Sequence, residues 1–267
     1  AAGEAVASVT ATRVRAARRR LGPVPRPAPP AGAPSGRRHV RTGSGAPAPC
    51  ASLPAPYPAA HLWHGGGMRS FGPEDLVEGE SVDGFTLDDV DAPGVRLLEC
   101  RLSAGTITGG DLTGSVWRAG RLERVRLVGA GLARSQWTAV ELSGCALSGC
   151  ELYGAQLRQV TFTDCVLDSV NLRGAQLREV TLTDCVVRDL DLGSAKLTDV
   201  GWPGTRIERL DLSFATLTRV DLRGASVDIA RGLDRLHGAV IDHGQLIDLA
   251  PALAAHLGLA VRARDLR

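Results

Sequence analysis

No histidine lies between Phe85 and Asp228, although the chain contains six. Histidine is a frequent general base and a frequent zinc ligand, so over half of the chain has no histidine for either role. The glycines of the same region do not form a phosphate-binding loop followed by a helix. We therefore expect no catalytic residues, no cofactor site and no metal site, and a protein that is not an enzyme.

Long apolar runs are also missing from the chain. A membrane-spanning helix needs about 18 or more consecutive apolar residues, and no such run occurs. We expect no membrane association.

A period of five residues runs from about residue 84 to about residue 229 without a change of phase. One stretch reads "CALSG CELYG AQLRQ VTFTD CVLDS". The first and third residues of each block are apolar and the second is usually polar, which is the alternation of a strand. The fourth and fifth residues are mostly Gly, Ser, Thr, Asp and Arg, which favour turns. Each block therefore predicts a short extended side followed by a corner.

Like residues also recur every twenty residues, which is every four blocks. The recurring sets are Ala155, Ala175, Ala195 and Ala215; Val140, Val160, Val180, Val200 and Val220; Cys145, Cys165 and Cys185; and Leu157, Leu177, Leu197 and Leu217. Four blocks then make one coil, and neighbouring coils lie roughly 4.8 Å apart, the distance between paired strands. About seven coils give a rod roughly 35 Å long at that spacing.

The blocks also predict which residues lie at corners and which lie inside. Fifth positions hold Gly144, Asp164, Asp184, Gly204 and Gly224. Gly and Asp tolerate a left-handed backbone, which a tight corner needs. First positions are small because a coil with five-residue sides encloses little space, so a Phe at Ala175 or Ala195 would overpack the interior.

Blocks such as "AQLRE", "VDLRG" and "CELYG" resemble those of the pentapeptide-repeat family. The resemblance covers over half of the chain and implies an all-β fold, a right-handed, four-sided β-solenoid. The blocks at the front depart from the pattern, with Ala92 at a third position and Gly105 and Gly120 at first positions. We expect the first coils to be less regular and less stable than the others.

Five of the six cysteines occupy first positions: Cys100, Cys145, Cys150, Cys165 and Cys185. We interpret them as small apolar groups of the interior. A metal site or disulfide bonds are the alternative. Reduced interior thiols favour a cytoplasmic protein.

Residues 1–67 differ sharply in composition from the repeats. Residues 1–69 hold ten Arg and a single acidic residue, and the segment is rich in Pro, Ala and Gly. We expect disorder. A nucleic-acid-binding arm, a metal-binding pair formed by His61 and His64, and lipid attachment at Cys50 are weaker alternatives. Met68 is the one methionine of the chain, and we hypothesise that natural translation begins there, with residues 68–83 forming a lead-in to the solenoid at 84–229.

Residues 230–267 predict a helical cap. Asp242 and Gln245 form a plausible capping box, and Gly258 is a stop signal. Four leucines follow the box at helical spacing: Leu246, Leu249, Leu253 and Leu257. Pro251 is expected to kink the helix or divide it in two. The helix would cover the open edge of the solenoid, and dimerisation of two chains through this segment is the alternative, as the resemblance to quinolone-resistance members implies.

The outward side chains remain for function. An interaction scaffold for an unidentified protein partner is the first hypothesis. The alternative comes from the resemblance, because some members of the family mimic DNA, bind DNA gyrase and protect it from quinolones. The candidate acidic line for that role is Glu151, Asn171, Asp191 and Asp211. Residues 84–229 carry nineteen acids and sixteen bases, net −3, and Arg173 and Arg223 lie on the same faces as acids, which weakens a phosphate mimic. We expect no direct binding of nucleic acid.

Overall fold

The structure is a computed structural model that describes residues 71–262. The predictions made for residues 1–67, including the His61 and His64 pair, Cys50 and a start at Met68, lie outside the described residues.

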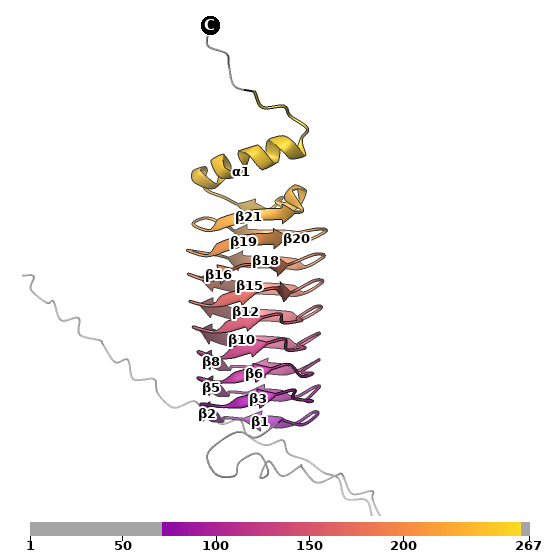
Figure 1. The fold of residues 1–267 in the computed structure, drawn as a ribbon, viewed down its shortest axis with the longest axis vertical. Helices are drawn as coiled ribbons and strands as arrows, with labels where there is room; N and C mark the ends of the chain where they lie inside the picture. The colour runs from indigo at the N-terminus through magenta and orange to yellow at the C-terminus, as the bar shows by residue number, and fades with distance from the viewer. Residues whose placement is uncertain (1–70, 263–267) are drawn as a thin grey trace, which may run out of the picture. The chain divides into compact units, whose positions relative to one another are not determined.

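Residues 76–231 form a four-sided β-solenoid in which strands pair in parallel at an offset of twenty residues, with register shifts only in the last coil (Figure 1). Gln136 pairs with Gln156, for example, and Gln156 pairs with Gln176. The twenty-residue coil predicted from the sequence is therefore confirmed. Because parallel pairing at this offset places each residue beside its equivalent in the next coil, interior and surface residues both form columns along the rod.

We name the four sides of the coil faces A to D in chain order. Face A carries β1 (Leu76–Glu78), β4 (Arg96–Leu98), β7 (Val116–Arg118), β10 (Gln136–Ser143), β12 (Gln156–Thr163), β15 (Gln176–Thr183), β18 (Lys196–Gly201) and β20 (Thr216–Asp221). Face B carries β2 (Ser81–Asp83), β5 (Arg101–Ser103), β8 (Arg121–Glu123) and the later halves of the long strands that begin on face A. Face C carries β3 (Thr86–Asp88), β6 (Thr106–Thr108), β9 (Arg126–Val128), β11 (Ala146–Ser148), β13 (Val166–Asp168), β16 (Val186–Val187), β19 (Arg206–Asp211) and β21 (Ser226–Arg231). Face D carries β14 (Val170–Asn171), β17 (Leu190–Asp191), the end of β19 and isolated bridges.

The solenoid has eight coils, one more than expected, since eight strands follow one another along face A before β22 (Ala239–Val240). The additional coil lies at the front, where β1 pairs with β4 and β2 pairs with β5. Residues 76–83, which the sequence assigned to a lead-in, therefore form strands. Their first positions, Asp75 and Glu80, are polar and only half-buried, so the apolar pattern that marks the other blocks is missing there.

The interior contains the first and third residues of the blocks, as predicted. Ala175, Ala195 and Leu157 are at most 2% exposed. Trp117 and Trp137 take third positions in neighbouring coils, and their rings stack with centroids 4.9 Å apart. Each indole N–H donates to the serine two residues earlier, Ser115 or Ser135, at 2.9 Å. These two serines are buried because the tryptophans need an acceptor inside the coil.

The corners adopt the left-handed backbone that the sequence predicted for Gly and Asp. Gly144, Asp164 and Asp184 have φ values of 60°, 52° and 52°. Many other corners carry residues that rarely adopt this conformation, such as Ala139 at 53° and Phe214 at 59°. Closure of the coil thus holds most fifth positions in this conformation whichever residue is present, with Asp189 and Arg209 among the exceptions.

A single helix, α1 (His243–His256), follows the last coil, after a short 3₁₀ helix at Leu233–Arg235 (Figure 1). The predicted capping box is present: Asp242 accepts from the Gln245 N–H at 3.0 Å, and the Gln245 side chain accepts from the Asp242 N–H at 2.8 Å. Gly258 has φ of 71° just past the helix end. The expectation that Pro251 divides the helix is wrong, because α1 continues through it. Within residues 71–262, no helix is long and apolar enough to cross a membrane.

Candidate functional site

The candidate acidic line forms one column on the surface of face D. Glu151 pairs with Asn171, Asn171 with Asp191, and Asp191 with Asp211. The same column continues toward the first coils through Gly131 to Asp111 and Asp91. Asp91 and Asp111 were missed from the sequence, although both lie at the same second position of the block and could have been found by counting back in twenties.

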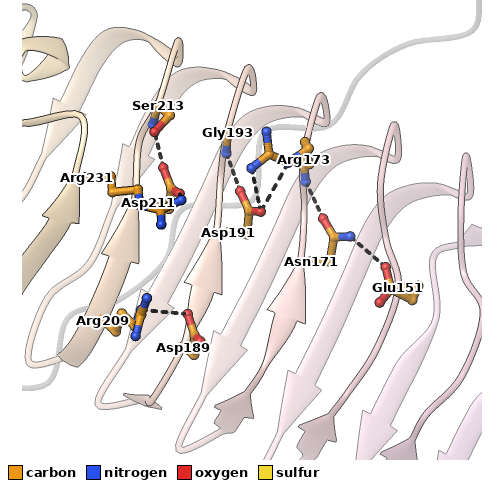
Figure 2. A network of polar contacts seen from close by, with 10 residues as sticks. All are labelled: Glu151, Asn171, Arg173, Asp189, Asp191, Gly193, Arg209, Asp211, Ser213 and Arg231. Atoms are coloured by element: carbon orange, nitrogen blue, oxygen red, sulfur yellow. Dashed lines mark hydrogen bonds and ion pairs between the residues drawn. The ribbon is translucent and has the colours of Figure 1, made fainter.

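The side chains of this column stabilise the corner that follows them. Asp191 accepts from the backbone N–H of Gly193 at 2.7 Å, and Asp211 accepts from that of Ser213 at 2.8 Å (Figure 2). Asn171 does the same for the N–H of Arg173 at 3.0 Å. This is the Asx turn that Asp and Asn favour. A structural role therefore accounts for the choice of Asp and Asn at this position.

Arginines neutralise the part of the line nearest α1 (Figure 2). The guanidinium of Arg173 donates to Asp191 at 2.9 Å and 3.2 Å. Arg231 lies 3.6 Å from Asp211. Burial of Asp211 acts to raise its pKa, but hydrogen bonds from Ser213, aided by these arginines, hold the pKa below its ordinary value. An arginine lies beside each of these two carboxylates, which weakens this half of the line as a phosphate mimic.

The half of the line nearer the first coils keeps its charge. Glu151 accepts from the Asn171 amide at 2.6 Å, and neither Asp91 nor Asp111 forms an ion pair within the described residues. The pKa of Asp111 lies below its ordinary value because the Thr113 side chain and backbone N–H donate to it, with a further contribution from the charge of Arg134. The carboxylates of the face D column that form no ion pair within the described residues are therefore Asp91, Asp111 and Glu151.

Face B, on the opposite side of the coil, repeats the pattern of compensated charge. Arg223 pairs with Asp221 at 2.7 Å, and Arg121 pairs with Glu141. At the corner between faces C and D, Arg209 lies 3.9 Å from Asp189 (Figure 2). Most of the outward surface thus carries both signs of charge in close pairs, as the sequence indicated.

The four leucines predicted for the C-terminal helix do not act together. Leu249 is buried at 7% exposure and Leu253 is half-buried, but Leu246 and Leu257 are exposed. A crevice of about 470 Å³ lies between α1 and the last coil, with Val227 and Ile229 among its lining residues. The helix therefore covers the end of the solenoid chiefly through Leu249 and leaves Leu246 and Leu257 in solvent.

The described cysteines are free and buried. Each donates its thiol to backbone carbonyls; Cys145, for example, donates to Leu122 at 3.3 Å. Burial raises the pKa of Cys150 to about 11. Among residues 71–262, no group of three His, Cys, Asp or Glu side chains is placed to hold a metal ion. The thiols thus have the packing role that their first positions indicated.

The family model described as the pentapeptide repeat region matches residues 135–191 and 155–231. No curated protein sequence matches the chain significantly. Among solved structures, a trypsin-treated variant of QnrB1, a plasmid-mediated fluoroquinolone resistance protein, is 18% identical, with 74% of this chain and 100% of the QnrB1 chain covered and a TM-score of 0.34. HetL, a pentapeptide repeat protein involved in heterocyst differentiation regulation from Nostoc sp. strain PCC 7120, is also 18% identical, with 66% and 93% covered and a TM-score of 0.28. These likenesses carry no conclusion about the activity of this chain. The matched repeat model and the observed five-residue sides and twenty-residue coils show that residues 135–231 form a pentapeptide repeat region.

Proposed function

We propose that the protein is a non-enzymatic scaffold that binds another protein chain. The observation that carries the proposal is the apolar surface left open at the C-terminal end of the described residues. Of the ten exposed large apolar side chains within residues 71–262, six lie within residues 240–261: Val240, Leu246, Ile247, Leu257, Leu259 and Val261. A clustered apolar surface of this kind is typical of a protein contact.

The first partner that this end fits is a second copy of the chain. Ile247 and Leu257 are 68% and 70% exposed, on the helix that follows the last coil. Two copies meeting at this end would bury both apolar surfaces around a twofold axis, the commonest symmetry of homodimers. Removal of these side chains from water would drive the association.

Sedimentation of the full chain over a range of concentrations tests this contact. We expect dimers in the wild type and monomers after Ile247→Asp combined with Leu257→Asp. The matched control is Leu76→Asp combined with Val128→Asp, which replaces two exposed apolar residues on faces of the solenoid and should leave the dimer intact. Wild-type monomers at all concentrations, or equal loss in both variants, would rule out this end as the contact.

Protection of DNA gyrase is a second candidate function. It is favoured by the carboxylates of Asp91, Asp111 and Glu151, which form no ion pair within the described residues. A DNA mimic needs negative charge spaced along a rod, and these three residues lie in one column. The ion pairs of Arg173 with Asp191 and of Arg231 with Asp211 reduce the negative charge at the other end of the column. The charge that remains is small for a phosphate mimic, so the scaffold stays the first proposal.

A gyrase supercoiling assay, with and without a quinolone, separates the two functions. If the chain acts as a DNA mimic, it changes supercoiling by gyrase or relieves the inhibition of gyrase by the quinolone. Asp111→Asn combined with Glu151→Gln should weaken that effect. Asp164→Asn with Asp184→Asn, at corners between faces B and C, removes the same charge elsewhere and should change nothing. Absence of any effect at micromolar protein would eliminate the gyrase hypothesis.

A further inference from the structure

Face A carries a strip of positive charge without a carboxylate. Between residues 96 and 198 its outward positions are Arg96, Leu98, Val116, Arg118, Gln136, Thr138, Gln156, Arg158, Gln176, Arg178, Lys196 and Thr198. We call the five cations of this set the basic strip: Arg96, Arg118, Arg158, Arg178 and Lys196. All five are exposed. The basic strip was not predicted from the sequence.

The cations of the basic strip are mostly unpaired. Within the described residues, Arg178 alone among them forms an ion pair, with Glu179 at 3.3 Å. Arg158 and Arg178 lie directly beside each other in paired strands. Like charges in that position repel and destabilise a sheet. The surface therefore carries a local cost that a bound anion would remove.

The strip is narrow and has an acidic edge along the corner to face B, where Glu99, Glu179 and Asp199 lie. Between residues 94 and 194, the corner to face D carries Arg134 and no acid. The two outward positions of a side are two residues apart, roughly 6.6 Å. A strip of that width accepts one extended chain, and a wider anion would meet the carboxylates along the face B edge.

Nucleic acids fit this surface poorly. The outward positions of face A between residues 96 and 198 include no aromatic side chain, so bases of a single strand have nothing to stack on. A duplex is wider than the strip, since its major groove alone measures about 12 Å. Its phosphates would meet the carboxylates along the face B edge.

The remaining side chains of the face suit a polypeptide. Gln136, Gln156 and Gln176 form a column that continues into Lys196. Each amide offers a donor and an acceptor, which can bind peptide groups and carboxylates alike. Resting on the scaffold function proposed above, we infer that the basic strip docks an extended acidic segment of a partner protein.

Fluorescence anisotropy with a short labelled poly-L-glutamate tests the inference on the full chain. Arg118→Glu combined with Arg158→Glu reverses two unpaired cations of the strip. Arg101→Glu combined with Arg126→Glu is the matched control, because both residues are exposed, lack ion pairs in the described structure and lie on faces B and C. Both variants change the net charge equally, and circular dichroism verifies that both retain the fold.

We expect wild-type binding that weakens with added salt, a loss of about tenfold or more in the strip variant, and a change of less than about twofold in the control. No binding at low salt, or equal loss in both variants, would overturn the inference. Tighter binding of a DNA duplex that is lost in the same strip variant would also overturn it, in favour of a nucleic acid. Each of these results is independent of the dimer measurement at α1, so failure of the strip is distinguishable from failure of the scaffold function.

Discussion

Gly105 provides a sharp test of the packing inside the first coils. The residue takes a first position, where the repeat favours a small or β-branched side chain, and its coil neighbour Phe85 is buried at 4% exposure. A Cβ atom at Gly105 would lie 2.1 Å from Cε1 and 2.3 Å from Cζ of the Phe85 ring. Ordinary carbon contacts are about 3.5–4.0 Å, so the ring would have to move by more than about 1 Å. The glycine therefore makes room for the phenylalanine.

Two opposing effects set the size of the change for Gly105→Ala. Overpacking of a filled core costs about 1–3 kcal/mol. Replacement of Gly by Ala also restricts the unfolded chain, which favours folding by about 0.4–1 kcal/mol. We expect a net loss of about 1–2 kcal/mol in the free energy of unfolding. Gly120→Ala is the matched control, because its nearest neighbour would be the carbonyl oxygen of Cys100 at 3.4 Å, and it should be neutral or slightly stabilising.

Urea unfolding followed by circular dichroism measures the global change, and hydrogen exchange in β3 and β6 measures it locally. The local measurement matters because a repeat stack can open from its end before the rest unfolds. Phe85→Val combined with Gly105→Ala should recover part of the loss, with a coupling free energy of about 1 kcal/mol or more. If Gly105→Ala is as stable as the wild type, or if the two changes are additive, Phe85 does not occupy the space over Gly105.

Four further outcomes follow from the interior and from the helix cap. Ala175 is 0% exposed, so Ala175→Phe should lower the free energy of unfolding in urea by at least about 1–3 kcal/mol. Gln176→Phe, at the exposed neighbouring position, should lower it far less. Equal stability of the two variants would contradict the assignment of Ala175 to the interior. Trp202 is buried and its indole N–H lacks a hydrogen-bond partner among the described residues. Thermal unfolding should therefore show that Trp202→Phe costs about 1 kcal/mol less stability than Trp137→Phe. The reverse order would show that the Trp137 hydrogen bond does not stabilise the fold. The pKa of Asp242 lies below its ordinary value because the backbone N–H of Gln245 donates to it. The stabilisation from this cap is therefore fully present above the unfolded pKa of about 3.9 and is lost as the pH falls through the lower folded pKa. Hydrogen exchange in the first turn of α1 should accelerate in acid in the wild type. In Asp242→Ala it should be fast at every pH. Burial raises the pKa of Cys100 and Cys150, so a thiol reagent should label the described cysteines only after unfolding, and rapid labelling of the native chain would contradict their packing.

The sequence predicted the coil because interior columns constrain residue type strongly. Small residues such as Ala155 and Ala175 recur where space is limited, and leucines such as Leu157 recur where it is not. The first coil was missed because Asp75 and Glu80 stand at positions that are apolar elsewhere. At the end of a stack a first position has a coil on one side only, so a polar group there keeps part of its hydration.

The candidate site was less predictable than the fold. Counting in twenties placed Glu151, Asn171, Asp191 and Asp211 in one column, which the structure bears out as an arrangement. The same counting cannot show where a guanidinium lies. Arg173 belongs to the coil of Asn171, yet its side chain reaches Asp191 in the next coil, because long side chains span the distance between coils. Compensation of charge therefore depends on rotamers that the pattern does not specify.

The columns of outward residues also help to distinguish charges that stabilise the fold from charges that bind a partner. The parallel pairing that stacks alanines inside must also stack the outward residues, so each surface charge lies roughly 4.8 Å from its equivalent in the next coil. Opposite charges lie in neighbouring coils at some positions, such as Arg121 with Glu141 and Asp199 with Arg219. Arg158 instead lies beside Arg178 and forms no ion pair within the described residues that would offset the repulsion. Exchange of Arg158 for Thr, the residue at the equivalent position 138, should therefore leave the unfolding midpoint unchanged or raise it while weakening poly-L-glutamate binding. A variant that lost stability and kept its binding would show that Arg158 serves the fold instead.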